Sequence, residues 1–160
     1  MALDLNDPKA IDYSSKTPLF PFTAYGTFKL ALLSYIESGP AGSETNKGDK
    51  EFDLALARIE ESNDPSIRPG DVYGFFFQTG GDGMTVKSRP YKAAALRDFH
   101  KGVLGIDPRD RSFDANAARG TMLTEDLSGG DNCVRLKTSK GNEIEGKPGE
   151  FYRNDTWSAA

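Results

Sequence analysis

Apolar and polar residues alternate along much of the chain, and a period of two is typical of β-strands, whose successive side chains point to opposite faces of a sheet. The alternation predicts five strands, at residues 25–38, 51–62, 71–79, 133–139 and 150–158. Loops rich in glycine, proline and polar residues separate several of these segments. The pattern therefore predicts a mostly β protein.

One segment has a helical period instead. Within residues 91–104, side chains of the apolar stripe recur at i, i+3, i+4 and i+7, with a proline at the start and a glycine just past the end. The stripe consists of Leu96, Phe99, His100 and Val103. Because such a stripe faces the core, we expect His100 to be a buried or hydrogen-bonded residue and not a ligand-binding one. Residues 114–123 are a candidate for a second, short helix.

Residues 51–62 fit two descriptions. Phe52, Leu54 and Leu56 alternate as in a strand, whereas the alanines and the glutamate-rich end would also suit a helix. The position of the segment between two clearer strands favours a strand. We expect a bulge near Ala57, because the apolar phase shifts there to Ile59.

The third strand carries two apolar rows where a sheet with one buried face needs only one. Tyr73, Phe75 and Phe77 fall on one side of the strand, and Val72, Gly74 and Phe76 fall on the other. If one row fills the core, three aromatic rings remain about 7 Å apart, at twice the rise per residue. Such a row suits flat ligands such as nucleic-acid bases. The alternative is that both rows are buried.

Three strands, a helix and two further strands is the element order of the OB-fold, a five-stranded, partly open Greek-key barrel. We therefore predict a single OB-fold domain over residues 25–158, preceded by an extended arm over residues 1–24, where three prolines block long regular elements. The stretch between the helix and the fourth strand, about 106–131, is longer than a minimal OB-fold needs. It is predicted to be an inserted loop with a short helix.

The distribution of charged residues along the chain adds to this picture. The 160 residues have a net charge of −4, but bases and acids are segregated. Residues 87–101 hold five bases and one acid, whereas residues 37–64 hold eight acids and three bases. Such segregation can create a basic face on an acidic protein, although solvated surfaces without a role remain the alternative.

The inventory of reactive side chains argues against most enzymes. A single cysteine, Cys133, excludes an internal disulfide and a cysteine-based zinc cluster, and a single histidine excludes His-pair metal sites. We therefore expect no catalytic residues, no metal and no cofactor. The first eight residues are acidic and lack an apolar centre, unlike a signal peptide, which predicts a cytoplasmic protein.

The chain resembles phage-encoded single-stranded DNA-binding proteins built on an OB-fold. The resemblance lies in the start Met1-Ala-Leu-Asp-Leu5, the aromatic third strand, the basic helix after it and the segments 133–141 and 150–157. It implies a protein that coats single strands exposed in DNA replication, recombination or repair, in the host cytoplasm. Its expected partners are single-stranded DNA and phage replication or recombination enzymes, and self-association is left open.

A binder with little sequence preference needs planar groups for bases and cations for phosphates. The predicted stacking residues are Tyr35, Tyr73, Phe75, Phe77 and Trp157. The predicted phosphate contacts are Lys29, Arg58, Lys87, Arg89, Lys92, Arg135, Lys137, Lys140 and Arg153. Two rival interpretations remain. In a structural or assembly protein the aromatic row would be a subunit interface, and in a nuclease acids from residues 37–64 would hold a divalent ion.

Overall fold

The computed structural model describes residues 17–38, 51–81, 84–125 and 132–160. Its strands are β1 (Gly26–Ser38), β2 (Glu51–Ser62), β3 (Val72–Gly80), β4 (Cys133–Glu143) and β5 (Phe151–Ala159). Its helices are α1 (Arg89–Leu104) and α2 (Ala115–Thr124), which follow one another between β3 and β4. The five predicted strands and the helix after the third one are therefore confirmed, and the ambiguous segment is a strand.

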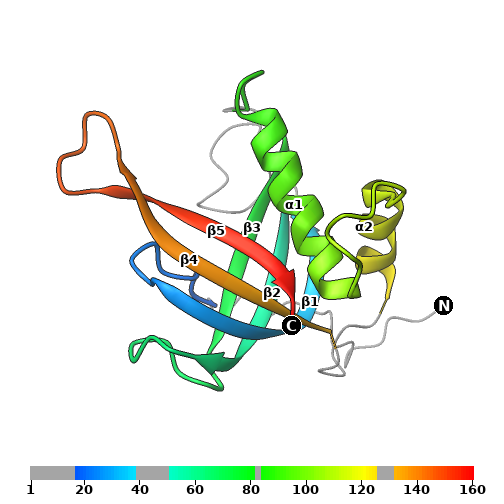
Figure 1. The fold of residues 1–160 in the computed structure, drawn as a ribbon, viewed down its shortest axis with the longest axis horizontal. Coiled ribbons are helices and arrows are strands. Elements are labelled where there is room, and N and C mark those ends of the chain that lie inside the picture. Colours follow the sequence, from blue (N-terminus) through cyan, green and yellow to red (C-terminus); the bar gives the residue numbers. More distant parts are fainter. Residues whose placement is uncertain (1–16, 39–50, 82–83, 126–131) are drawn as a thin grey trace.

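The strands form one antiparallel sheet in the order β3-β2-β1-β4-β5. In the described part of the chain no ladder joins β3 to β5, so backbone hydrogen bonds do not close the sheet into a barrel. The sheet is strongly curved, α1 lies across one side of it against β5, and the β4–β5 hairpin projects away from both helices (Figure 1).

Bulges in the paired strands β1 and β2 help to explain the curvature. The register of β1 against β2 shifts between Lys29 and Leu30 and again between Leu32 and Ser34. An extra residue on one strand bends that strand and increases its twist. The second strand does contain an extra residue, but at Glu60, three positions past the predicted Ala57; opposite Ala57 and Leu56 the extra residue is Leu33 of β1.

Part of the predicted N-terminal arm packs against the sheet. The Phe20 amide donates to the Gly74 carbonyl of β3 at 3.1 Å, and the Gly74 amide donates to the Pro18 carbonyl at 2.9 Å. The Phe20 ring is buried and stacks on Phe75 at 5.1 Å between ring centroids. On the far side, Arg153 of β5 donates to the Pro21 carbonyl at 2.7 Å. This segment thus lies between the two edge strands; residues 1–16 are outside the described part.

Local chemistry marks both ends of α1 and the start of α2. Proline stands in the first turn of α1, and Gly105 ends it in the left-handed conformation with φ 67°. The Asp114 side chain caps α2 by accepting from the Asn116 and Ala117 amides at 3.0 and 3.1 Å. No helix in the described ranges is long and apolar enough to span a membrane.

Candidate nucleic-acid interface

The aromatic row of β3 points into the core. Phe75 is 6% exposed and meets Trp157 of β5 at 5.5 Å between centroids, while Phe77 packs on Phe99 of α1 at 4.6 Å. Tyr73 is partly buried against the same core. The prediction that this row faces outward is therefore wrong. Of the two rows, the one with three large rings removes more apolar area from water when it is buried.

Two further predicted stacking residues are also in the core. Tyr35 is fully buried, and Trp157 is 7% exposed among Phe75, Phe77 and Phe99. The outward placement of Tyr35 is wrong because the extra residue Leu33 changes which of the later residues of β1 face inward. None of the five predicted stacking residues therefore offers an open ring face on the outer side of the sheet.

The outer side of β2 and β3 carries a different pair of rings. Phe52 of β2 and Phe76 of β3 lie 5.4 Å apart in an edge-to-face arrangement, and both are half-buried. Leu54, Leu56 and Arg58 continue the same face of β2, because the buried residues of that strand alternate with them. Sequence reasoning missed Phe52 and Phe76 as site residues. The available signal was the second apolar row of the third strand.

The size of its side chains explains which face of β2 is buried. Its inward positions include Ala55 and Ala57, which are small and belong to the same core cluster as the larger Leu32 and Phe99. Close packing leaves little room for Phe52 or Leu54 on the inner side. The apolar residues that sequence analysis grouped as one strand face are therefore on the outer surface.

Cations extend this outer face onto the neighbouring strands. Lys29 of β1 is directly opposite Arg135 of β4, and Thr27 is opposite Lys137, while Val134 and Leu136 between them are buried. Residues paired across an antiparallel ladder share a face. Arg58 is opposite Ala31, two positions along from Lys29. Four predicted phosphate contacts are thus brought onto one surface.

Acids border the same surface. The Arg58 guanidinium is 2.7 Å from a carboxylate oxygen of Glu60, and Glu61 is opposite Lys29 in the β1–β2 ladder. An exposed ion pair of this kind contributes little to stability, so Arg58 can exchange its partner for a phosphate at small cost. We therefore keep Arg58 among the candidate contacts.

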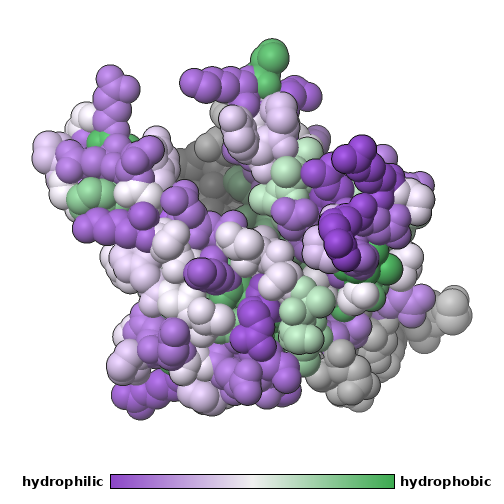
Figure 2. Space-filling view, viewed as in Figure 1, coloured by the Kyte–Doolittle hydropathy of each residue, from purple (hydrophilic) through white to green (hydrophobic). Residues whose placement is uncertain are grey.

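Two other predicted cations have structural contacts. The Arg153 side chain is 9% exposed, pairs with Asp155 at 2.7 Å and covers the Phe20 ring at 5.0 Å. The Lys140 ammonium lies 3.7 Å from the centroid of the Phe151 ring on the β4–β5 hairpin. Arg153 thus links β5 to the N-terminal segment, whereas Lys140 lies on an exposed hairpin whose surface is mostly hydrophilic (Figure 2).

The remaining predicted cations are at the start of α1. Lys87 and Arg89 are exposed, and the Lys92 ammonium donates to the Gln78 side chain at the end of β3. Arg89 and Lys92 line a cleft of about 380 Å³ between α1, α2 and the end of β3. The cations predicted as one set therefore fall into at least two groups, one on the outer sheet face and one beside the helices.

A buried polar network lies beneath this cleft. The Arg119 guanidinium of α2 makes two hydrogen bonds of 2.7 Å to the carboxylate of Asp53, which is fully buried on β2. The Tyr35 hydroxyl donates to the same carboxylate at 2.5 Å and lies 3.2 Å from Nε2 of His100. Desolvation and the adjacent Asp53 carboxylate raise the pKa of Tyr35, so its phenol stays protonated.

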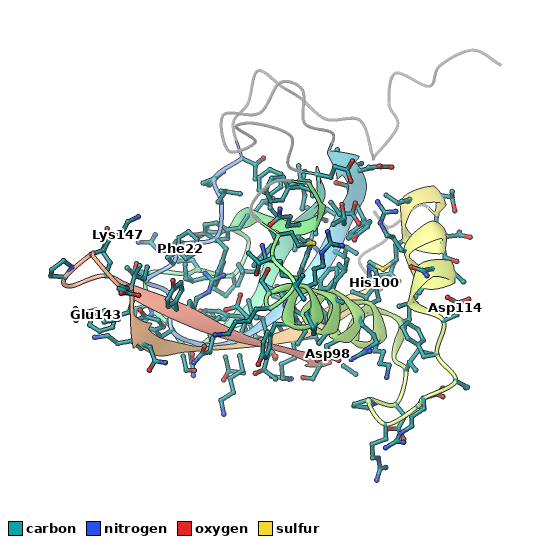
Figure 3. The ribbon with its side chains drawn as sticks, turned by 90° about the horizontal axis from the view of Figure 1, so that it is seen from above. Phe22, Asp98, His100, Asp114, Glu143 and Lys147 are labelled. Carbon is teal, nitrogen blue, oxygen red and sulfur yellow. The ribbon has the colours of Figure 1, made fainter. Side chains whose placement is uncertain are left out.

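His100 is buried and hydrogen-bonded, as predicted. It is 1% exposed and lies on the side of α1 that faces α2, whereas Asp98 is on another side of the helix (Figure 3). Burial lowers the pKa of His100 to about 4, and the nearby Asp53 carboxylate offsets only part of that effect. The imidazole is therefore neutral near pH 7.

Among the described residues, no group of three or more histidine, cysteine, aspartate or glutamate side chains is arranged to hold a metal ion. Comparison with known proteins adds no relative. No protein-family model matches the chain, and neither a curated protein nor a solved structure matches it.

Proposed function

We propose that this protein binds single-stranded DNA without catalysing a reaction, over the outer face of the sheet. The observation that carries the proposal is the Phe52–Phe76 pair on β2 and β3, with Arg58 on the same face and Lys29 and Arg135 on the adjoining strands. Planar groups and cations on one surface are what a binder of single strands with little sequence preference requires.

The strand order supports an OB-like architecture for this surface. The spatial order β4-β1-β2-β3 is that of a Greek key, and the fifth strand continues it beyond β4. Rings on the inner sides of the edge strands meet at Phe75–Trp157 and Phe77–Trp157, so their side chains come together without a backbone ladder. In OB-folds the face of the second and third strands binds oligonucleotides. Phe52 and Phe76 are on those two strands.

The physical basis of binding follows from these groups. Each base stacked on an aromatic ring contributes roughly 1–3 kcal/mol, as measured by truncating the ring, and does so for any base. Cations add an electrostatic contribution to affinity that weakens as the salt concentration rises, because neutralised phosphates release counterions. The net charge of −4 disfavours indiscriminate binding to duplexes, so the protein should prefer single strands. A role in phage replication, recombination or repair remains a prediction.

The test is fluorescence anisotropy of labelled oligo-dT titrated with wild-type protein and with Phe52→Leu and Phe76→Leu. Leucine keeps much of the apolar volume but removes the ring, so folding should survive while stacking is lost. We expect the wild type to bind the single strand far better than a duplex. Each variant should bind at least fivefold more weakly, the lower end of the stacking contribution.

Arg58→Ala and Arg109→Ala form a matched pair for the charged contribution. Both arginines pair with a nearby acid, but Arg109 lies on the exposed loop between α1 and α2, paired with Asp107. Only Arg58→Ala should weaken binding. No affinity of the wild type for oligo-dT at low salt would overturn the proposal.

The assembly interpretation keeps one specific observation in its favour. Leu19, Leu54 and Leu56 all approach Gly74 on the outer side of β3, and together they form an apolar strip beside Phe76. Had this strip evolved as a subunit contact, the protein would form a stable oligomer that Phe76→Leu weakens, without oligo-dT affinity. Light scattering on the same samples distinguishes this outcome from DNA binding.

A further inference from the structure

The cleft between α1 and α2 has the chemistry of a small-molecule site. One continuous face of α1 lines it, formed by Arg89, Lys92, Ala93, Leu96, Arg97 and His100. These positions repeat at the spacing of three and four that places residues on one side of a helix. Arg119 and Asn116 of α2 form the opposite wall, and Gln78 and Thr79 of β3 form an end. Its volume of about 380 Å³ is within the range of sites for small ligands.

The cleft is electropositive. Its lining includes three arginines and a lysine, and no described lining residue is an acid. Arg119 is largely compensated by Asp53, but Arg89 and Arg97 form no ion pair with any described residue. The first turn of α1 also contains no acid, although the amino-terminal end of a helix favours negative charge. Repulsion among these cations is a cost that a bound anion would remove.

A second, independent feature points to a ligand with a hydrogen-bond donor. The Tyr35 hydroxyl has one proton and donates it to Asp53, so it can only accept from His100. His100 must then carry its proton on Nε2, and Nδ1 is left as an acceptor. This buried nitrogen has no hydrogen-bond partner among the described residues. An unsatisfied buried acceptor is unfavourable, and because His100 lines the cleft, a donor from a ligand would relieve that cost.

We propose that this cleft binds a nucleoside monophosphate unit, with its phosphate at Arg89 and Arg97 and a base or sugar donor at His100. A nucleotide supplies an anion, N–H or O–H donors and an apolar base face for the Leu96 and Ala93 side of the cleft. The unit could come from a free nucleotide or from the phosphorylated end of a strand. The site is on the helices, so it does not depend on binding over the outer sheet face.

The chain contains one histidine, so the imidazole nitrogens of His100 give unambiguous NMR signals. We would titrate the full-length protein with thymidine monophosphate and follow these signals together with binding heat. The expected result is a saturable change at Nδ1. Binding should weaken at least tenfold in Arg97→Glu, and remain unchanged in Arg109→Glu, which makes the same charge change outside the cleft.

Two further experiments distinguish a free nucleotide from a strand end and exclude nonspecific binding of an anion. Oligo-dT with a 5′-phosphate should outcompete the 5′-hydroxyl form if the cleft takes strand ends, whereas equal competition with strong mononucleotide binding assigns it to free nucleotides. Inorganic phosphate should bind much more weakly than thymidine monophosphate. Equal binding of the two, or no change at His100 with millimolar nucleotide in a folded protein, would overturn the proposal. Phe76→Leu should leave this binding intact even if it abolishes oligo-dT binding.

Discussion

At the scale of single residues, the carboxylate of Asp53 depends most on its partners, because it lies inside the core. Asp53 is fully buried, and its charge is compensated by the two-pronged contact from Arg119 and by the Tyr35 hydroxyl. Hydrogen bonds to Asp53 raise the pKa of Arg119, so its guanidinium stays charged at neutral pH. Removing one partner of a buried pair leaves an uncompensated charge, which destabilises the fold far more than replacing both partners by apolar residues.

We therefore expect Arg119→Met to lower the free energy of unfolding by about 3 kcal/mol or more, measured by urea denaturation. Arg109→Met removes an ion pair whose side chains are 91% and 57% exposed, and should change stability by less than about 1 kcal/mol. The double variant Asp53→Asn/Arg119→Met should recover part of the loss, because no buried charge remains. Equal costs for the two arginines would show that Arg119 does not stabilise the buried carboxylate.

The residue scale is also where sequence reasoning reached its limit. The period of two in β3 correctly separated Tyr73, Phe75 and Phe77 from Phe76, but a period says which residues share a face and not which face is inside. That choice depends on what packs opposite, here Trp157 and Phe99, which are remote in the sequence. The burial predicted for His100 is confirmed, because the apolar stripe of a helix indicates by itself which side faces the core.

At the scale of elements, strands and helices were predictable because their signals are local. Proline and glycine marked the ends of α1, and Asp114 marked the start of α2. The docking of α1 was not predictable, because it depends on a close approach at Gly102. A Cβ atom there would lie 2.7 Å from a Val134 methyl carbon and 2.9 Å from the Ser158 carbonyl oxygen. The helix backbone thus sits directly against β4 and β5.

Substitution of a helical glycine by alanine should therefore have opposite effects on stability at two positions. Gly102→Ala forces α1 away from Ser158 and should destabilise the protein by about 1–3 kcal/mol, despite the better helix propensity of alanine. Gly120→Ala in α2 meets no atom within 4 Å and should stabilise it by up to about 1 kcal/mol. Thermal unfolding of the two variants tests this directly. A stabilised Gly102→Ala would mean that α1 does not pack this closely on the sheet.

At the scale of the whole molecule, the curved sheet separates two positively charged regions. One is the outer face with Lys29, Arg58, Arg135 and Lys137, and the other is the cleft beside α1. Composition and net charge could not reveal this division, because neither says which cations the fold brings together. Only the pairing of β1 with β4, whose residues are about a hundred positions apart, gathers Lys29 with Arg135.

The salt dependence of oligo-dT binding should report which region holds the phosphates. For single strands the slope of log affinity against log salt is about −0.7 per neutralised phosphate. Contact with three or four cations of the outer face predicts a slope of about −2 to −3. Arg135→Ala and Lys137→Ala should each make it shallower by about 0.7, and Arg97→Ala should not change it.

The opposite pattern of salt slopes would place the bound DNA strand beside α1. If Arg97→Ala and Arg89→Ala made the slope shallower while Arg135→Ala and Lys137→Ala left it unchanged, the phosphates would run beside α1, and the outer rings would be outside the path. The side chains of Arg135 and Lys137 have no ion-pair partner in the described part of the chain. Their loss should therefore act on phosphates with little effect on folding, which makes the change in slope attributable to binding.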